Sequence, residues 1–501
     1  MPHVDIIGSG MAGLALGIHL QKNGFSTTIY EQHSVPGGLC TSWKRGPYTF
    51  NGCVHWVLGA RSGISFYHFW KELFDIDKIP FYMPSERVVF DMPIPDRNGC
   101  KQFFFYTDID RFEHYLLSIA PEDATEISNW CKQVRMIMPL LDYLPPAWPQ
   151  QLCNKIKLTL KLTKLLPLLP FMHKWGKLTN RSYAEHFSNA FLRNAISMLY
   201  DAEMRMTVVV FAQAYAAKQV AQYPIGGSAF FASQLVDSYH ACGGSLRLST
   251  KVNSIVIVGD KAQGLILSNG ERTTADFVVS AADWHWTVFS ALKGKYLNKK
   301  LLQLQYPNKD EVFYSYCRLF IGVSMPMTSV PHFARIATQP ITLPDGTHYD
   351  HLEVEIYNND PTLAPEGHVA MVVNMLTREG EWWINLRQTD IKTYRETKQQ
   401  LETELLLRLE QYYGTEWRNH VEVTDLATPA TFFRYTSNLW GSSQGWSPRA
   451  DITKRMPIRT TLPHLRNFML CGHWTEAGGG IPVAIYSARK VALQICKQLL
   501  K

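Results

Sequence analysis

The chain has 501 residues, of which 46% are hydrophobic and 19% are charged. This balance excludes a wholly disordered protein, and the length predicts two domains rather than one compact core. The formal net charge of +7 is modest for this length. Without a zinc-finger or ribonucleoprotein motif it gives no reason to expect a nucleic acid as partner. Aromatic residues make up 12%, which suits a large core and a wide apolar pocket equally well.

The nine cysteines are widely spaced, and no two have the C-x-x-C spacing of a zinc or redox motif. A reducing, cytosol-facing compartment therefore fits best. The first residues, Met1–Asp5, do not show the basic and apolar regions of a signal peptide. No run of 18 apolar residues is present, so a membrane-spanning helix is not expected. The expected location is cytoplasmic, with attachment to the inner face of a membrane as a further option.

The N-terminal residues follow the pattern of a βαβ unit. Val4–Ile7 reads as a buried strand, and the glycine-rich Gly8–Gly13 follows it at once. Leu14–Lys22 then reads as a helix, and Ser26–Tyr30 reads as a second strand that ends at the acidic Glu31. This is the G-x-G-x-x-G fingerprint in the strand, turn and helix context that it requires. The unit therefore predicts a dinucleotide site.

Each glycine of this motif has a separate physical task. Gly8 permits the tight turn, Gly10 lets the backbone approach a pyrophosphate, and Gly13 allows close packing of helix on strand. The start of the helix offers free N–H groups and a partial positive charge to the phosphates. Glu31 can accept hydrogen bonds from the adenosine ribose.

Three further segments extend the pattern. The pair Gly37-Gly38 follows soon after Glu31. In the middle of the chain a helix-like stretch, Phe230–Cys242, is followed by strand-like runs that lead to Ala275–Asp283. At the C-terminus a buried strand ends in Gly472, and a glycine-rich turn leads into a final helix. That turn is a second helix start able to face a phosphate or a flavin.

Taken together, these segments resemble the carotenoid and retinoid branch of the amine-oxidase-like flavoproteins. This branch includes phytoene desaturases, carotenoid cis–trans isomerases and retinol saturases. The matching stretches span both ends and the middle of the chain, whereas residues 90–215 and 290–420 match only loosely. The family often has Asp where this chain has His473, and a basic or polar residue where it has Leu39. At these two positions the resemblance does not define which residue contacts the FAD phosphates.

The resemblance implies an α/β fold with a Rossmann-like FAD-binding domain assembled from discontinuous segments, plus an α+β substrate domain. We expect the FAD-binding domain to comprise residues 1–90, 215–290 and 420–501, and the substrate domain residues 91–214 and 291–419. The cofactor would be FAD. No second G-x-G-x-x-G is present, so a dedicated nicotinamide domain is not expected. NAD(P)H remains open as an electron donor that binds transiently.

By the same resemblance, most of the residues expected to contact FAD lie in the glycine-rich and strand segments described above. They are Gly8, Gly10, Met11, Ala12, Gly13, Glu31, Gln32, Gly38, Leu39, Trp56, Val252, Ala281, Gly472, His473, Gly480, Ile481 and Pro482.

The catalytic candidates are His55, Glu476 and Tyr435, of which His55 is preferred. The flavin performs the hydride chemistry, and the protein supplies orientation and electrostatics. Reduction of a C=C bond also needs a proton donor, and histidine is suited to this near neutral pH. Retinol saturases carry a histidine in a context like Gly52–Trp56, so the resemblance leans to reduction of a long lipophilic polyene (a carotenoid, retinoid or polyenoyl chain). Isomerisation and desaturation remain alternatives, and a structural hydrogen bond is an alternative role for each candidate.

Residues 143–184 contain seven basic residues and no acid between Tyr143 and Ala184. Leucines, Phe171 and Trp175 are interleaved with them. This composition suits an interfacial segment on anionic lipid, from which a lipophilic substrate would enter. A solvated basic helix face is the alternative.

Two other classes remain open. The chain could be a binding protein of the same fold without catalysis, or an amine oxidase, which rests on the shared fold alone. The polyene could also be free or carrier-bound. No metal-spaced His/Cys set, P-loop or G-x-S-x-G elbow is present, so no metal site, kinase or hydrolase is expected.

Overall fold

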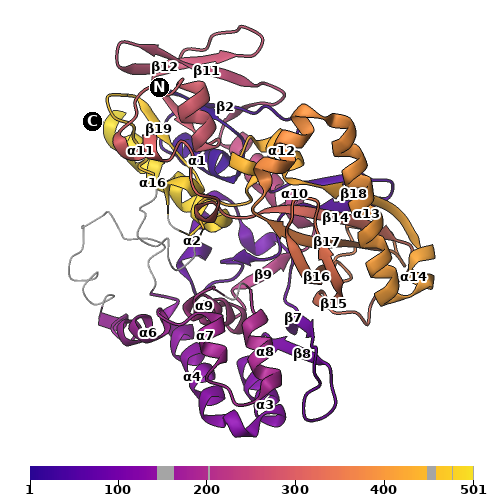
Figure 1. Cartoon of the computed structure of the whole chain (residues 1–501). Helices are drawn as coiled ribbons and strands as arrows, with labels where there is room; N and C mark the ends of the chain where they lie inside the picture. The colour runs from indigo at the N-terminus through magenta and orange to yellow at the C-terminus, as the bar shows by residue number, and fades with distance from the viewer. Residues whose placement is uncertain (144–162, 201–202, 448–457, 477, 500–501) are drawn as a thin grey trace.

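The structure is a computed structural model, and it describes residues 1–143, 163–200, 203–447, 458–476 and 478–499. Two sheets organise the molecule, one near the two termini and one beneath a long helix (Figure 1). A lobe of helices lies at the bottom of the molecule in Figure 1. No helix in these described ranges is long and apolar enough to cross a membrane.

The first sheet is parallel and five-stranded, with the order β10-β2-β1-β13-β19. Its strands are β1 (His3–Ile7), β2 (Ser26–Tyr30), β10 (Ser245–Arg247), β13 (Phe277–Ser280) and β19 (Phe468–Leu470). Helices α1 (Met11–Lys22), α2 (Ser65–Leu73), α10 (Gly227–Ala241) and α16 (Gly480–Leu499) share its core. Both faces of β1 are covered, so all of Val4–Ile7 is buried, and the one polar residue among them, Asp5, accepts from the Thr273 hydroxyl. The sheet is thus Rossmann-like and built from distant pieces of chain.

A two-stranded ribbon projects beside this sheet. It pairs β11 (Val252–Val258) with β12 (Lys261–Leu267) in antiparallel register. A second small ribbon, β3 (Ser42–Arg45) with β4 (Tyr48–Asn51), follows the Gly37-Gly38 segment. Three short strands, β5 (Val57–Leu58), β9 (Ala221–Pro224) and β6 (Phe81–Tyr82), form another small sheet between the larger units.

The second large sheet has seven strands in the order β18-β14-β17-β16-β15-β7-β8. They are β7 (Glu86–Asp91), β8 (Gln102–Tyr106), β14 (Ser315–Val323), β15 (Phe333–Thr342), β16 (His348–Ile356), β17 (Val369–Thr377) and β18 (Val421–Ala427). Both β7 and β18 thus pair within this sheet, although most of β7 and all of β18 were expected in the FAD-binding domain. Strand pairing overrides the linear division because both segments extend one continuous hydrogen-bonded ladder.

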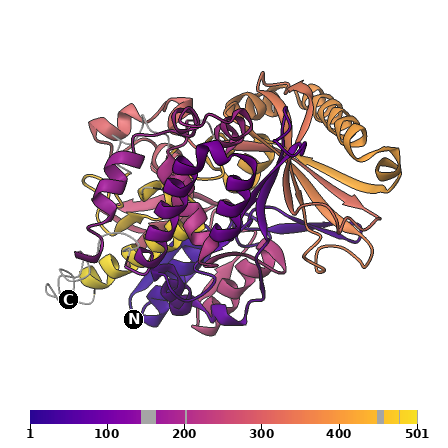
Figure 2. The ribbon, with the colours of Figure 1, turned by 90° about the horizontal axis from the view of Figure 1, so that it is seen from below.

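The two faces of this sheet differ sharply. One face packs its apolar side chains, such as Leu319, Val354 and Val373, against helix α13 (Ile391–Tyr413). Figure 2 shows this long helix running along the outside of the strands. Helices α12 (Gly380–Thr389) and α14 (Thr415–Asn419) adjoin it. Because side chains alternate along a strand, the residues between these apolar ones face the inside of the molecule.

The helical lobe has its own core, which includes Trp130, Trp175 and Tyr183. Its helices are α3 (Ile109–Ile119), α4 (Ala124–Leu140), α6 (Leu168–Trp175), α7 (Asn180–Ala184), α8 (Ala190–Met198) and α9 (Met206–Ala217). Two short helices lie elsewhere, α11 (Lys299–Gln303) and α15 (Pro429–Thr436). In this lobe, the expected membrane-facing segment 143–184 is described only in part, because residues 144–162 lie outside the described ranges.

Candidate active site

The turn between β1 and α1 forms a glycine-lined cradle. Gly8 has a φ of +94°, a conformation that L side chains rarely adopt. A Cβ on Gly13 would lie 2.0 Å from the carbonyl oxygen of Gly8, so only glycine lets helix and strand come this close. A Cβ on Gly10 would meet nothing within 4 Å, and no side chain caps the start of α1. Open space beside uncapped helix N–H groups fits the pyrophosphate of a dinucleotide.

Distant segments meet at this cradle. A Cβ on Gly38 would lie 3.3 Å from the Cα of Gly10, so the second glycine segment adjoins the first. A Cβ on Gly472 would lie 3.9 Å from that of Ala12 at the start of α1. The backbone N–H of Ala281 donates to the carbonyl of Ile7 at 2.9 Å. These contacts bring four separately predicted pieces of chain to one place.

Glu31 lies at the end of β2 and is only 7% exposed. Its Oε2 accepts from the backbone N–H of Ser9 at 2.8 Å and from the Ser9 hydroxyl at 2.9 Å. Its Oε1 accepts from the N–H of His33 at 2.9 Å. A carboxylate has about four acceptor positions, so these bonds fix it in place and leave capacity for a ribose hydroxyl. The segment before Val252 is adjacent, since the N–H of Thr250 donates to the Glu31 carbonyl at 2.7 Å.

The remaining expected FAD contacts fall into two groups. Met11 and Ala12 are buried in the first turn of α1, and Leu39 follows Gly38. Gly480, Ile481 and Pro482 begin α16, and His473 precedes that helix. Burial lowers the pKa of His473 to about 4, and its buried Nε2 has no hydrogen-bond partner within the described ranges. A neutral imidazole with an unsatisfied ring nitrogen is suited to a polar cofactor atom.

Tyr435 and Glu476 are not brought to a shared site with His55. Tyr435 is 43% exposed, and its ring packs edge-on against His33 with a centroid distance of 4.8 Å. Its carbonyl accepts from Nε2 of Gln32 at 2.9 Å. Tyr435 therefore lies beside the Glu31 end of the cradle. Glu476 forms an ion pair with Lys490 of α16 at 2.6 Å, which occupies its carboxylate.

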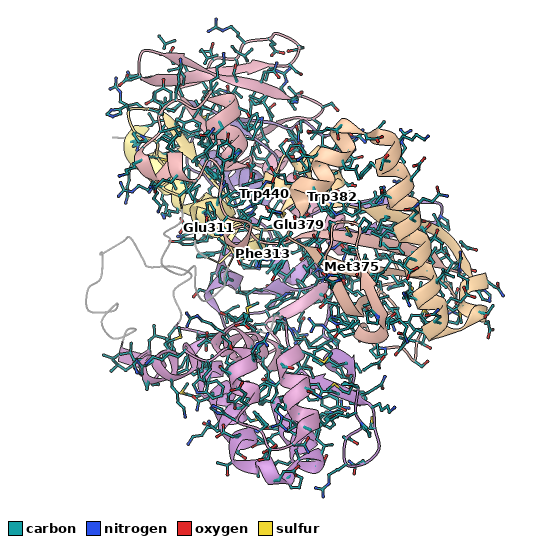
Figure 3. All side chains as sticks on the ribbon, in the orientation of Figure 1. Glu311, Phe313, Met375, Glu379, Trp382 and Trp440 are labelled. Atoms are coloured by element: carbon teal, nitrogen blue, oxygen red, sulfur yellow. The ribbon has the colours of Figure 1, made fainter. Side chains whose placement is uncertain are left out.

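A cavity of about 740 Å³ lies between the seven-stranded sheet and the helical lobe. This volume is within the usual range for a small-molecule site. His55 and Trp56 line it, and Ser447 lines it close to the C-terminal segment. Phe313 and Glu379, near the centre of the molecule, line it as well (Figure 3). Its aromatic lining comprises Trp56, Phe90, Phe105, Tyr200, Tyr223, Phe313, Tyr314, Tyr316, Phe333 and Tyr349.

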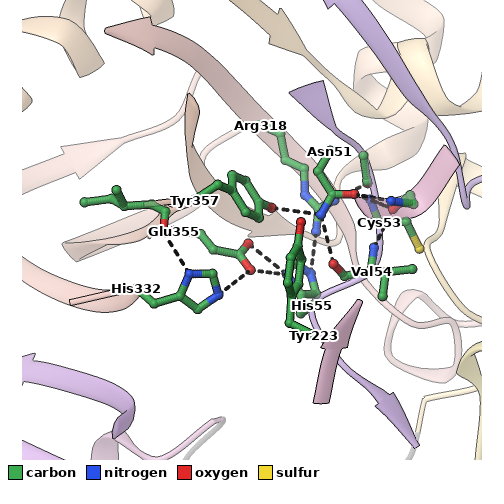
Figure 4. A network of polar contacts seen from close by, with 12 residues as sticks. Asn51, Cys53, Val54, His55, Tyr223, Arg318, His332, Glu355 and Tyr357 are labelled. Carbon is green, nitrogen blue, oxygen red and sulfur yellow. Dashed lines mark hydrogen bonds and ion pairs between the residues drawn. The ribbon is translucent and has the colours of Figure 1, made fainter. Parts of the chain in front are cut away.

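At one end of the cavity His55 is held on both ring nitrogens (Figure 4). Its Nδ1 lies 2.8 Å from both carboxylate oxygens of Glu355, and its Nε2 lies 3.2 Å from Nη2 of Arg318. An arginine can only donate, so Nε2 accepts and the single proton of a neutral His55 resides on Nδ1. Arg318 also donates to the carbonyl of Gly52. Its guanidinium lies 4.1 Å from the ring centroid of Tyr316.

Glu355 is 1% exposed and belongs to β16. Burial by itself would raise the pKa of this carboxyl, but His55, His332 and Arg318 outweigh it and lower the pKa to about 2. His332 donates from Nδ1 to the carbonyl of Ile356 at 2.8 Å, and burial lowers its pKa. Glu355 is therefore ionised at neutral pH, in a pocket where a buried charge needs partners.

The sequence analysis did not find Arg318, His332 or Glu355. One signal was available for Arg318, which interrupts the otherwise apolar end of β14, Cys317–Val323. A charged residue inside a strand buried on both sides is rare unless it is paired. Glu355 has no comparable signal because β16 carries charged and apolar residues alternately.

The parallel sheet and its glycine cradle define a dinucleotide-binding protein of the Rossmann class. The chain belongs to the flavin containing amine oxidoreductases, whose family model matches residues 11–496. It is thus an FAD-dependent oxidoreductase, and the cradle residues fit that cofactor. Among curated proteins it is similar to a lycopene-forming phytoene desaturase of Paracoccus sp., at 24% identity, with 97% of this chain and 96% of the relative covered.

A second relative is prolycopene isomerase 1 of an Oncidium hybrid cultivar, 23% identical, with 99% of this chain and 84% of the relative covered. These matches confirm the expected relationship to the desaturase and isomerase branch. Among solved structures, a putrescine oxidase redesigned in its cofactor binding has a TM-score of 0.59 at 12% identity and covers 99% of each chain. An oxidoreductase from Methanosarcina mazei has a TM-score of 0.56 at 14% identity, covering 98% of this chain and 99% of that one. These two show the fold alone.

Proposed function

We propose that this flavoprotein acts on the C=C bonds of a long lipophilic polyene. The observation that carries the proposal is the aromatic-lined cavity of about 740 Å³, bordered by His55 at one end and by Ser447 near the C-terminal glycine segment at the other. Both borders adjoin segments expected to contact FAD. A cavity with a largely aromatic lining beside the cofactor suits a polyene. The names of the relatives, which include desaturases and isomerases of carotenoid substrates, support the same class.

Within this site, the chain's own residues bind and orient. When bound, FAD supplies hydride transfer. The aromatic walls exclude water and hold the chain of the substrate, since flat rings bury much apolar area. Arg318 and Glu355 fix the imidazole of His55 against the cavity. His55 is therefore proposed as a positioning residue of the cavity wall.

The geometry bears on the direction of the reaction. A reductase must protonate its substrate, yet the one proton of a neutral His55 is held by Glu355, and its other nitrogen faces Arg318. Desaturation and cis–trans isomerisation need no group that protonates the polyene. We propose these two reactions ahead of the reduction that the sequence favours, and reduction is the second candidate.

The test uses the FAD-loaded protein without oxygen. Oxidised protein is mixed with retinoid and carotenoid polyenes, and then the experiment is repeated with chemically reduced protein. Flavin bleaching in the first case indicates desaturation, and reoxidation in the second indicates reduction. A change in the polyene spectrum without a flavin change indicates isomerisation. No change with any polyene would refute the proposal. Addition of NAD(P)H in the same experiment tests whether it serves as electron donor.

We further propose that the protein receives its substrate at a membrane surface, with a carrier-bound polyene as the alternative. On and beside α6, the apolar side chains Leu166, Leu169 and Met172 are 56%, 65% and 48% exposed. Lys164 and Lys174 flank them. Exposed apolar side chains with basic neighbours suit an anionic lipid interface. The basic residues Lys155, Lys157 and Lys161 of the same segment lie outside the described residues.

A further inference from the structure

The wall of the cavity contributed by the seven-stranded sheet is strongly polar. Strand register places Arg318, Asn374, Glu353 and Arg335 side by side on β14, β17, β16 and β15. All four side chains line the cavity. The alternate residues of the same strands form the apolar core on the other face. A cavity for a pure hydrocarbon needs no such wall, and enclosed polar groups are costly unless they find partners.

Most of these charges are already paired within the protein. Arg335 and Glu353 form an ion pair at 2.5 Å, and Glu355 holds His55. Glu379 pairs with Lys309, and Asp345 accepts from the indole N–H of Trp383 at 2.7 Å. These groups therefore need no ligand.

Arg378 differs from them. Its Nη1 donates to the carbonyls of Lys309 and Val312 at 3.0 and 3.1 Å, and its Nε lies 3.6 Å from Asp310. Its Nη2 is buried and has no partner within the described parts of the chain. The guanidinium also lies 4.0 Å from the ring centroid of Tyr314, which holds it in place. A fixed donor of this kind is ready to bind an acceptor in the cavity.

A second unsatisfied group lies at the same end. The Oγ of Ser447 is buried, lines the cavity and has no partner among the described residues. Its backbone N–H donates to the carbonyl of Glu311 at 2.8 Å. Ser447 is thus tied to the short segment whose carbonyls also hold Arg378. An unsatisfied buried polar group in a native protein needs an explanation, and in the wall of a cavity a bound ligand atom provides one.

The two ends of the cavity are well separated. Asn374 of β17 is paired with Arg318, and Arg378 comes four residues after Asn374. Four residues of a strand span about 13 Å, which is the approximate separation of Arg318 and Arg378 along the sheet. Between the ends, the aromatic residues Tyr314, Tyr316 and Tyr349 line the wall. The cavity therefore has the length of an extended apolar chain, with a cationic donor and a hydroxyl at one end.

We propose that the polyene carries a terminal carboxylate, which Arg378 and Ser447 bind while the chain lies along the aromatic wall. This inference rests on the proposed function and narrows its substrate class. The planar guanidinium matches a carboxylate, and a serine hydroxyl adds one further donor. An ester could offer the guanidinium only a neutral carbonyl oxygen, and a hydrocarbon could offer no acceptor.

The test measures binding to the FAD-loaded protein by quenching of tryptophan fluorescence. The probes are all-trans retinoic acid and its methyl ester, which share one apolar chain. We expect the acid to bind roughly tenfold to a hundredfold more tightly than the ester, the value of a hydrogen bond to a charged group. Arg378→Met should remove this difference in affinity, because it weakens the binding of the acid and leaves the binding of the ester unchanged. Ser447→Ala should reduce it in part and tests the site without disturbing the Arg378 bonds to backbone.

The matched control is Arg395→Met, on the exposed outer side of α13, which should keep the full preference. Equal binding of acid and ester by the unaltered protein would overturn the carboxylate proposal, as would equal weakening of both by Arg378→Met. If both probes bind or react with the flavin without any preference, the polyene function stands and only the head-group inference fails. If neither probe nor any hydrocarbon polyene binds or reacts, the proposed function fails as well.

Discussion

Nη2 of Arg318 lies 3.2 Å from Nε2 of His55, and this contact determines what His55 can do. The arginine supplies the proton of that hydrogen bond, so the imidazole accepts it. The Nδ1 proton is held by Glu355 at 2.8 Å. The three side chains form one unit that lines the cavity.

Substitution of His55 and substitution of Glu355 should therefore lower the activity to a similar extent. We expect His55→Gln and Glu355→Gln each to lower kcat/KM by less than about 100-fold, and the double variant to lower it little further, because both break the same unit. Proton donation by His55 would instead predict a loss of about 10²–10⁴ in His55→Gln alone, together with loss of one limb of the pH–rate profile. Steady-state kinetics over pH 5–9 would decide (roughly the range in which histidine titrates).

Tyr435→Phe is the matched control for that experiment. The side chain of Tyr435 is 43% exposed and packs against His33, away from the His55 end of the cavity. Its activity should stay close to that of the unaltered protein. A large loss would instead restore Tyr435 as a catalytic candidate.

Gly10→Val should separate folding from cofactor binding. The backbone of Gly10 has φ −64° and ψ 174°, which valine adopts readily, and a Cβ there meets no protein atom within 4 Å. The side chain would instead occupy the space expected for the pyrophosphate. We expect a folded protein that lacks flavin absorbance, whereas Ser34→Val, at an exposed position nearby, should keep its flavin. Absorbance spectra and circular dichroism of purified samples test this. A yellow Gly10→Val protein would contradict the proposed cradle.

His19 predicts a specific dependence of stability on pH. It lies in α1 at 8% exposure, its Nε2 has no partner among the described residues, and burial lowers its pKa to about 4. Between pH 6.5 and pH 4 the unfolded chain binds a proton that the folded chain does not, so stability falls as pH falls through this window. From pH 7 to pH 5 the loss from this group is about 2 kcal/mol.

The variant His19→Leu should lack that part of the pH dependence. Urea unfolding at pH 7 and pH 5 measures it as a difference between the two proteins. An equal loss of stability from pH 7 to pH 5 in both proteins would mean that His19 is not held neutral in the folded state.

Leu169→Glu and Met172→Glu should weaken binding to anionic liposomes. These side chains are among the most exposed apolar residues of the helical lobe. Each substitution places a negative charge where an interfacial helix needs an apolar contact. The new carboxylate also repels the anionic lipid. Leu407→Glu, at a side chain 47% exposed on α13, is the control and should leave binding unchanged. Vesicle co-sedimentation provides the measurement, and equal binding by all three variants would exclude α6 as the lipid contact.

The nucleotide-binding strands were predictable because their signals are local. The βαβ unit was expected with a strand at Ser26–Tyr30, and β2 spans these same residues. The strand-like runs expected after Phe230–Cys242 are likewise present, and β11 and β12 are two of them. Helix starts were less accurate, since α10 begins at Gly227 rather than at Phe230. In that turn Gly226 has a φ of +100°, and apolar periodicity does not show a helix start of this kind.

The polar end of the cavity was not predictable in the same way. Arg318 and Glu355 are 37 positions apart in sequence, and the ladder of β14, β17 and β16 brings them together. Which strands pair is a property of the whole sheet, and no motif in either strand encodes it. Motif matching therefore predicted the cofactor segments but left the polar residues of the cavity wall unidentified.

The strand order of the nucleotide sheet also has a consequence for synthesis. The central strand β1 is translated first, but its neighbour β13 follows some 270 residues later, and the edge strand β19 comes only at Phe468–Leu470. The helical lobe and all seven strands of the second sheet emerge before β19. The cofactor cradle therefore closes only after β19 has emerged, and free FAD becomes able to stabilise the protein from that point on. A ribosome stalled before β19 would hold a chain whose apolar β1 lacks its finished sheet, which makes chaperone capture of that intermediate a direct result of the topology.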